Sequence, residues 1–393
     1  MAAISSFKQA LFVVVWNVIL LVLGAIVLEL IFGSWFTAPK LWSLSIMRDV
    51  DYEYSAASMY ERSGLVHFSR DEFGLRGDYK RMEDVNIIAI GGSTTDEGGV
   101  SDDESWPAVM QACLRTKGIA ATVANAGVGG QTSRGHAMNY RVWLNHVPGL
   151  APVLSVILIG FNDNRAIPEN LDLDDVTVYL GNEPDPEQRA YKAFRKWAKI
   201  NSAFYGLYRI IKGNIQALRL ELGPMANRLQ ESTGREVDET GVEKEERLLR
   251  ESWHNSVVMG SPEYHAKRAE TRKSRKIIND AYGKRLEVLD QAAREFGTIP
   301  VFVTQHAGRY RLDKTGALRG QIGHFFSIDS TNEVTRDYCA QRNMFCIDLA
   351  SEMFFSANDI YDGIHTTPQG SRKIGMKVCE KLSQWPDRPQ LTE

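Results

Sequence analysis

The amino-acid sequence predicts an α/β protein whose parallel sheet is covered by helices on both faces. Short apolar runs recur along the chain, and each is too short to be a typical helix. Segments with apolar residues at helical spacing separate these runs, so that consecutive strands are joined by crossover connections. Glycine and polar residues directly follow several of the runs, which is where open α/β sheets place their sites.

The elements can be assigned in order along the chain. The predicted strands are short apolar runs: Val85–Ile90, Ala121–Ala126, Val153–Ile159, Pro300–Thr304 and Met344–Leu349. The predicted helices have apolar residues three or four positions apart: Glu104–Lys117, Ser133–Val147, Ser274–Phe296, Glu333–Arg342 and a last helix that starts near Pro368. The regular alternation of the two kinds of element predicts one domain over residues 85–390.

The N-terminus has a different character. From Leu11 to Leu28 the only clearly polar side chain is Asn17, and a run of about 18 apolar residues just reaches the length that crosses a bilayer. Phe32, Trp35 and Phe36 stand where an aromatic interface belt is expected. We therefore expect residues 1–36 to be a single-pass membrane anchor that crosses through residues 11–28. A cleaved signal peptide is the main alternative, but no good small-x-small cleavage site follows the run.

Two further segments lie outside the α/β pattern. Residues 37–84 are expected to be a polar lead-in, and residues 167–276 a mostly helical insertion. Within the insertion, Gln188–Leu222 carries an aromatic stripe that either packs on the main domain or forms a lid that faces the membrane or the substrate. The highly charged stretch Gln230–Arg250 is expected to be a mobile loop or a solvated helix.

Composition excludes some functions and leaves others open. The formal net charge is −3 and no long basic run occurs, so a nucleic-acid partner is not expected. Basic residues stand both before and after the apolar run, so the positive-inside rule does not decide which end of it is cytoplasmic. The four cysteines have no CxxC spacing. Cys339 and Cys346 are candidates for a disulfide in an oxidising compartment, and buried free thiols are the alternative.

Ser93 is the candidate nucleophile. It follows the first predicted strand through Gly91 and Gly92, and a turn at that point exposes a side chain at the sheet edge beside a helix N-terminus. A phosphate-binding or helix-capping serine is the alternative for this short motif. The chain has no Gly-x-x-x-x-Gly-Lys sequence here, so a Walker loop is excluded.

Asp362 and His365 are the candidate acid and base. A serine hydroxyl needs a base to take its proton, and an acid must hold the imidazole in one tautomer. Residues three positions apart meet on one turn of the chain, which fits this pair. His306 and His324 are rival bases, although neither has an acid at a comparable spacing.

The remaining requirement of acyl transfer is a set of donors for the oxyanion of the tetrahedral intermediate. The backbone amide of Ser93 provides one donor, and the side chain of Asn162 after the third strand provides another. The glycine cluster Gly127, Gly129 and Gly130 offers a third, because glycine lets the backbone approach closely.

Four segments together resemble the conserved blocks of the SGNH (GDSL-like) hydrolase superfamily, over roughly Val85–Asp163 and Lys276–Gly370. By this resemblance the nucleophile maps to Ser93, the glycine of the second block to Gly130, and the asparagine of the third to Asn162. The Asp-x-x-His of the last block maps to Asp362 and His365. The first block of the family usually reads Gly-Asp-Ser, and Gly92 replaces the aspartate here, which is expected to alter local hydrogen bonding.

The resemblance implies a three-layer α/β/α sandwich with a flavodoxin-like parallel sheet, no metal or cofactor, and hydrolysis or transfer of acyl groups on esters. It also favours a catalytic domain that is periplasmic or otherwise extracytoplasmic. We therefore expect a membrane-anchored serine esterase that removes a short acyl group, such as acetyl, from an envelope glycan or lipid.

Two alternatives remain at this stage. The same acyl-enzyme can pass its acyl group to a glycan hydroxyl, because the anchor can place the domain beside a membrane acyl donor. A membrane-protein partner is a separate expectation. The chain can instead be a non-catalytic binding or assembly protein on the same fold, which the insertion and Gly92 suggest and the intact site residues oppose.

Overall fold

The computed structural model describes residues 2–36, 41, 44, 46–62, 64–164, 198, 201–208, 211–212 and 239–391. Much of the expected insertion, including most of the Gln188–Leu222 stripe, lies outside these residues. The expected domain limits at residues 36, 84 and 390 remain predictions.

A central parallel sheet has the strand order β4-β3-β5-β7. Its strands match four of the predicted runs, with each end within two residues: β3 (Ile87–Gly91), β4 (Val123–Asn125), β5 (Leu154–Ile159) and β7 (Ile299–Thr304). The fifth predicted strand, Met344–Leu349, is wrong as a strand, since only Ile347 forms a parallel bridge, to Val303. The next residues enter the short helix α11 (Leu349–Glu352), which ends the pairing. With this bridge the order is the flavodoxin-like 2-1-3-4-5.

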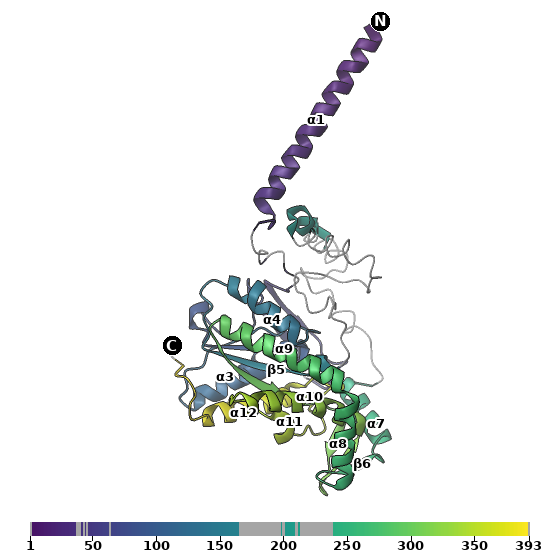
Figure 1. Ribbon diagram of the computed structural model, residues 1–393, viewed down its shortest axis with the longest axis vertical. Helices are drawn as coiled ribbons and strands as arrows, with labels where there is room; N and C mark the ends of the chain where they lie inside the picture. Colours follow the sequence, from purple (N-terminus) through teal and green to yellow (C-terminus); the bar gives the residue numbers. More distant parts are fainter. Residues whose placement is uncertain are drawn as a thin grey trace.

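Alternate residues of β3 point to the two faces of the sheet and build two separate cores. Ile88 and Ile90 belong to the core beneath α4 (Ser133–Val142) and α9 (Lys276–Glu295). Ile87 and Ala89 belong to the core beneath α3 (Trp106–Thr116) and α12 (Pro368–Gln384). Figure 1 shows β5 between these two helical layers. The three-layer α/β/α sandwich is therefore confirmed.

Three helix predictions need correction. The helix predicted over Ser133–Val147 is α4, which ends at Val142, and a separate 3-10 turn follows at Leu144–His146. The segment predicted as one helix, Ser274–Phe296, contains the end of α8 (Pro262–Ser274) and the whole of α9, because the chain breaks at Arg275. The helix predicted over Glu333–Arg342 is α10 (Ile322–Gln341), which starts eleven residues earlier. Its first turns have buried residues on several sides, among them Phe325, Phe326 and Ile328, so one apolar stripe does not reveal them.

The residues around the sandwich are more structured than expected. The lead-in contains a hairpin of β1 (Val50–Tyr54) and β2 (Val66–Arg70). The second part of the chain adds α7 (Gly241–Glu251) and a small antiparallel sheet, β6-β9-β8. The strands of that sheet are β6 (Ser256–Val258), β9 (Ala317–Gly320) and β8 (Tyr310–Leu312). The remaining short elements are α2 (Ser93–Asp96) and the 3-10 turns Met82–Asp84, Asp102–Glu104, Leu144–His146 and Asn162–Asn164.

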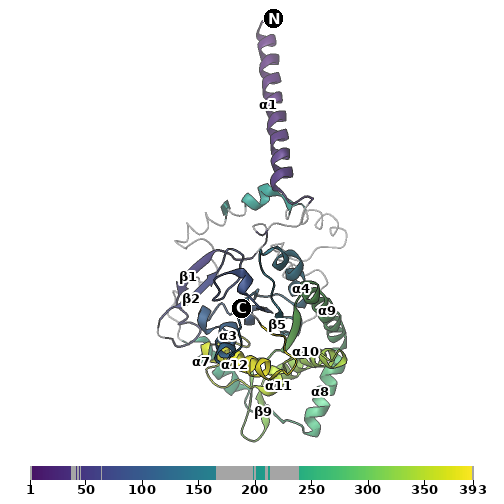
Figure 2. The ribbon, with the colours of Figure 1, turned by 90° about the vertical axis from the view of Figure 1, so that its left-hand side faces the viewer.

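Helix α1 (Ala2–Phe32) extends away from the sandwich (Figures 1 and 2). Its part from Leu11 to Phe32 has 22 residues and is not buried, and among the described residues it is the one helix long and apolar enough to cross a membrane. A helix of this length spans about 33 Å, which matches a hydrocarbon core of about 30 Å. Length and composition alone also suit a signal sequence.

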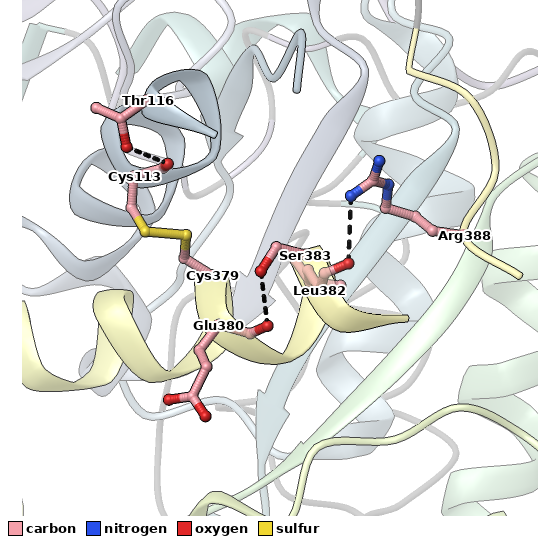
Figure 3. Close-up of a disulfide and its surroundings, with 7 residues drawn as sticks. All are labelled: Cys113, Thr116, Cys379, Glu380, Leu382, Ser383 and Arg388. Carbon is pink, nitrogen blue, oxygen red and sulfur yellow. Dashed lines mark hydrogen bonds between the residues drawn. A yellow bond between two sulfur atoms is a disulfide. The ribbon is translucent and has the colours of Figure 1, made fainter. Parts of the chain in front are cut away.

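All four cysteines form disulfides. Cys339 and Cys346 pair across seven positions, one of the two alternatives expected from the sequence. Cys113 in α3 and Cys379 in α12 pair across 266 positions, which was not predicted (Figure 3). This second bond joins the two helices that cover one face of the sheet.

Candidate active site

Ser93 is the first residue of α2, directly after β3 and Gly91-Gly92. The carbonyl of Gly92 accepts hydrogen bonds from the amides of Thr95 and Asp96, so the chain turns from strand to helix within two residues. This turn places Ser93 at the carboxyl edge of the sheet, next to the strand-order reversal between β3 and β5.

His365 and Asp362 come from the loop before α12 and meet Ser93 there. The Nε2 atom of His365 lies 2.8 Å from Ser93 Oγ, and its Nδ1 atom lies 2.6 Å from Asp362 Oδ2. The other carboxylate oxygen of Asp362 accepts the backbone amides of Ile364 and His365, at 2.8 and 2.7 Å. The ring of Tyr361 stacks on the imidazole, with centroids 5.8 Å apart. The structure thus brings the three predicted residues into one hydrogen-bonded row.

The protonation of Asp362 follows from its partners. Burial disfavours its charge, but the hydrogen bonds from His365 and Ile364 outweigh that effect, and the pKa of Asp362 lies below its ordinary value. An ionised Asp362 can only accept a hydrogen bond, so the proton of a neutral His365 resides on Nδ1. The Nε2 lone pair then faces Ser93 Oγ, as a general base requires.

The two rival histidines do not contact Ser93. His306 is buried, accepts the amide of Phe355 at Nε2, and has a pKa that burial lowers to about 3. Burial also lowers the pKa of His324 to about 4, and its ring lies 6.1 Å from that of Phe161. Both are neutral ring-packing residues near physiological pH.

The side chain of Asn162 lies beside the turn at Gly92 and Ser93, and the absence of a side chain at Gly92 leaves space for it. A Cβ atom on residue 92 would lie 2.8 Å from Asn162 Nδ2, closer than side chains tolerate. The same nitrogen donates to the carbonyl of Gln131 at 2.8 Å. An amide nitrogen carries two N–H donors, so this bond orients the side chain and leaves one donor for another acceptor. In this chain a side chain at position 92 would therefore require the Asn162 amide to move.

The glycine loop after β4 also passes close to Ser93. A Cβ atom on Gly129 would lie 3.9 Å from the Cβ of Ser93. Gly130, the predicted donor, has φ +81°, a conformation that favours glycine. The assignment of the Gly130 amide to the oxyanion remains a prediction.

Asp163, which follows β5, forms hydrogen bonds with Ser133 at the start of α4. Its carboxylate accepts the amide and the hydroxyl of Ser133, at 3.0 and 2.7 Å, and the guanidinium of Arg285 at 2.9 Å. Burial raises the pKa of Asp163, although Arg285 and Ser133 favour the charged form. These bonds hold Asp163, and with it the neighbouring Asn162, against the start of α4.

Sequence reasoning missed Gln305, which follows the last residue of β7. Its amide donates to Thr94 Oγ1 at 2.7 Å and accepts the backbone amide of Phe161 at 3.2 Å. Gln305 therefore links the residue after Ser93 to the residue before Asn162. Its place directly after a predicted strand, at the same sheet edge, is the signal that could have found it.

Glu97 is the second missed residue. It ends the short helix that Ser93 begins, and its amide donates to the Ser93 carbonyl at 2.9 Å. Its almost fully buried carboxylate accepts hydrogen bonds from the amide of Trp106 and the hydroxyls of Thr366 and Ser371, at 2.7, 2.7 and 2.8 Å. Burial nevertheless raises its pKa to about 7. Because Thr366 directly follows His365, Glu97 connects the turn that carries Ser93 to the loop that carries Asp362 and His365, the histidine loop.

Helix α7 buttresses the histidine loop from outside. A Cβ on Gly241, its first residue, would lie 2.4 Å from the carbonyl oxygen of Tyr361. Val242 packs with Tyr361 in a small apolar cluster that includes the β1–β2 hairpin. The charged stretch Gln230–Arg250, whose described part is helical from Gly241, is therefore not a mobile loop there.

Comparison with known proteins shows the family to which this chain belongs. The sequence pattern of the GDSL-like lipase/acylhydrolase family matches residues 89–373, well over half of the chain. The chain belongs to this family. As a GDSL-like acylhydrolase it is an ester hydrolase, and the matched residues contain all five predicted site residues.

Solved structures resemble the chain at low identity. An acetyl xylan esterase is 14% identical with a TM-score of 0.38, covering 76% of this chain and 100% of that one. A catalytic mutant of an acetylxylan esterase from Geobacillus stearothermophilus is 12% identical with a TM-score of 0.37, over 76% and 93%. A member of the lipolytic protein G-D-S-L family from Veillonella parvula is 12% identical with a TM-score of 0.37, over 77% and 100%. No curated protein matches the sequence.

Proposed function

We propose that the chain is a membrane-anchored serine esterase in which Ser93 is the nucleophile, His365 the base and Asp362 the orienting acid. The observation that carries the proposal is the row Ser93 Oγ–His365 Nε2 at 2.8 Å and His365 Nδ1–Asp362 Oδ2 at 2.6 Å. Both distances lie within hydrogen-bond reach, which a nucleophile and its base must satisfy before proton transfer.

The reaction proceeds in two steps. Ser93 Oγ attacks the acyl carbon while His365 Nε2 takes its proton, and the carbonyl oxygen becomes an oxyanion. His365 then returns the proton to the leaving alkoxide as the ester bond breaks, which leaves an acyl-Ser93 and a free alcohol. In the second step His365 takes a proton from water, the hydroxide attacks the acyl carbon, and the carboxylic acid leaves as Ser93 recovers its proton.

The oxyanion needs donors that are in place before the reaction. We assign this role to the backbone amides of Ser93 and Gly130 and to the free N–H of Asn162. The hydrogen bond from Asn162 to the Gln131 carbonyl supports the assignment, because it holds the side chain beside the nucleophile turn in advance.

A short acyl group, acetyl or similar, is the proposed acyl part, and an envelope glycan or lipid the proposed alcohol part. The cavity beside Ser93 is small, about 10 Å³, which is room for about one water and leaves no space for a long acyl chain. Its lining is rich in polar groups rather than apolar, with Gln131, His136, Asp163 and Gln305 among them.

The proposed location is a membrane, with the catalytic domain on its extracytoplasmic side. Helix α1 supports the anchor, since it is long, apolar and exposed. The two disulfides support an oxidising compartment, where such bonds form and persist.

The test uses the purified full-length chain in detergent with short-chain aryl esters and acetylated oligosaccharides as substrates. We expect release of the free acid, and Ser93→Ala should abolish turnover while circular dichroism and thermal melting stay unchanged. Wild-type turnover by Ser93→Ala would contradict the assignment. Acyl transfer to an added sugar, detected by mass spectrometry as the main product, would instead identify a transferase.

A further inference from the structure

The end of α1 holds a segment that is distant in sequence. The carboxylate of Glu29 accepts the hydroxyl of Ser202 at 2.5 Å and the amides of Ala203 and Phe204 at 2.8 and 3.1 Å. The amide of Ser34 donates to the carbonyl of Asn201 at 2.8 Å. We call residues 201–208 and 211–212 the junction segment.

Glu29 acts as the cap of the junction segment. Residues 203–208 and 211–212 are helical, and the first amides of a helix lack partners within it. A carboxylate at this position satisfies them and complements the positive end of the helix dipole. The Nε1 atom of Trp35 donates to the same carboxylate at 3.2 Å. An acidic residue at the end of an apolar helix thus has several donors.

The junction segment presents an apolar stripe that the described residues do not cover. Phe204, Leu207, Tyr208 and Ile211 are 44, 51, 54 and 50% exposed. Phe204, Leu207 and Tyr208 are three and one positions apart, which places them on one face of the helix over 203–208, and Ile211 is exposed in the helical residues 211–212. Exposed apolar side chains grouped on one face of a helix indicate a contact surface.

The position of the stripe identifies its partner. Figures 1 and 2 show the junction segment beside the base of α1, and in Figure 2 it runs across the axis of α1. Phe36, next to this base, is 86% exposed. If α1 crosses the membrane, a helix at its end and across its axis lies at the level of the lipid headgroups, where aromatic residues and amphipathic helices are favourable.

We propose that the junction segment is an interfacial membrane helix, which inserts Phe204, Leu207, Tyr208 and Ile211 between lipid headgroups and which Glu29 holds at the end of the anchor. This inference rests on the proposed membrane anchoring. It gives the chain two points of contact with the bilayer, a spanning helix and an in-plane helix. Of the alternatives open for the aromatic stripe, it favours the membrane-facing one for the described residues.

The experiment places an environment-sensitive fluorophore, NBD, at single cysteines in the full-length chain in phosphatidylcholine vesicles. All four native cysteines are in disulfides, so the new thiol is labelled selectively. The positions are Leu207→Cys in the junction segment, Leu20→Cys within α1 and Lys314→Cys in the exposed turn between β8 and β9. Lipids that carry a spin label quench the fluorophore on contact.

We expect the label at residue 207 to lose at least about half of its fluorescence to a spin label near the headgroup, as for an interfacial helix. The label at residue 20 should respond to a spin label deep in the acyl chains, and that at residue 314 to neither. Quenching at residue 20 without quenching at residue 207 would overturn this inference and leave the anchor intact. Absence of quenching at both would overturn the anchor as well.

Glu29→Ala tests the cap. Removal of the carboxylate should reduce quenching at residue 207 and leave quenching at residue 20 unchanged. Equal quenching at residue 207 in both forms would contradict the role of Glu29 in holding the segment.

Discussion

The two halves of the candidate site are held in different ways. The nucleophile half rests on a buried network, in which Thr94, Thr95 and Glu97 are almost inaccessible to solvent. The side chains of Asp362 and His365 are instead 42% and 30% exposed, and the bonds between them join residues three positions apart. The partly buried Ser93 is therefore supported by buried neighbours, whereas Asp362 and His365 lie on a more exposed loop.

This difference separates catalysis from stability. Substitutions in the loop should remove activity and leave the fold largely intact, because few buried partners depend on exposed side chains. Substitutions in the network beneath Ser93 should lower stability too, because they leave buried polar groups without partners.

The largest effect is expected for His365→Ala. Without a base the Ser93 hydroxyl stays protonated, and kcat should fall by about 10⁵–10⁶-fold, as when one member of a catalytic triad is lost. The free energy of unfolding should change by less than about 1 kcal/mol, since the imidazole is partly exposed. Steady-state kinetics and denaturant titration measure the two quantities. A variant that loses its fold together with its activity would break the distinction between the halves.

A smaller effect is expected for Asn162→Ala. Loss of one oxyanion donor should lower kcat by about 10²–10³-fold with little change in KM. Gly92→Ala is the matched variant, because its Cβ would displace the Asn162 amide while it leaves that amide present. It should lower kcat in the same direction and by less. Full activity in both variants would show that Asn162 does not stabilise the transition state.

The smallest effect on activity and the clearest on stability are expected for Glu97→Gln. The pKa of Glu97 is raised to about 7 by burial, so the folded state binds its proton more tightly than the unfolded state does. The stability that this carboxyl contributes is therefore fully present below its unfolded pKa and is lost as pH rises toward 7. This loss should amount to about 2–3 kcal/mol between pH 4.5 and 7, at 1.36 kcal/mol per pKa unit.

Glutamine cannot ionise, so Glu97→Gln should remove this contribution to the pH dependence. Its amide oxygen can still accept from Trp106 and Ser371, and its NH2 group can donate to the hydroxyl of Thr366. Unfolding titrations of both proteins across this pH range measure the difference. Identical pH profiles would show that Glu97 is not coupled to folding.

The candidate site residues were easier to predict from the sequence than the buried residues that hold them in place. Ser93, Asn162 and His365 could be found because each lies in a short motif that follows a strand or precedes a helix. Gln305 has a weaker signal, its place directly after a predicted strand. Glu97 has none, since an acidic residue in a loop gives no sign that it will be buried against another loop. The Cys113–Cys379 bond was equally hidden, because it joins α3 to α12 across 266 positions.

The secondary structure was also predictable only in part, where apolar residues form a clear pattern. The four core strands are mostly apolar and were recognised, since both faces of the sheet are buried. The fifth was wrong because Ile347 alone pairs before the chain turns into α11. The start of α10 was missed because its buried residues include polar ones, among them Asp329, Ser330 and Asn332. Apolar periodicity does not detect a helix buried through hydrogen bonds.

The account depends most directly on whether His365 activates Ser93. The full-length protein should be treated with a fluorophosphonate probe and the adduct located by mass spectrometry, with His365→Ala and Ser93→Ala as controls. We predict an adduct on Ser93 that forms in the wild type and is lost in both variants. Labelling of Ser93 at the same rate in His365→Ala, or no labelling of the folded wild type, would contradict it.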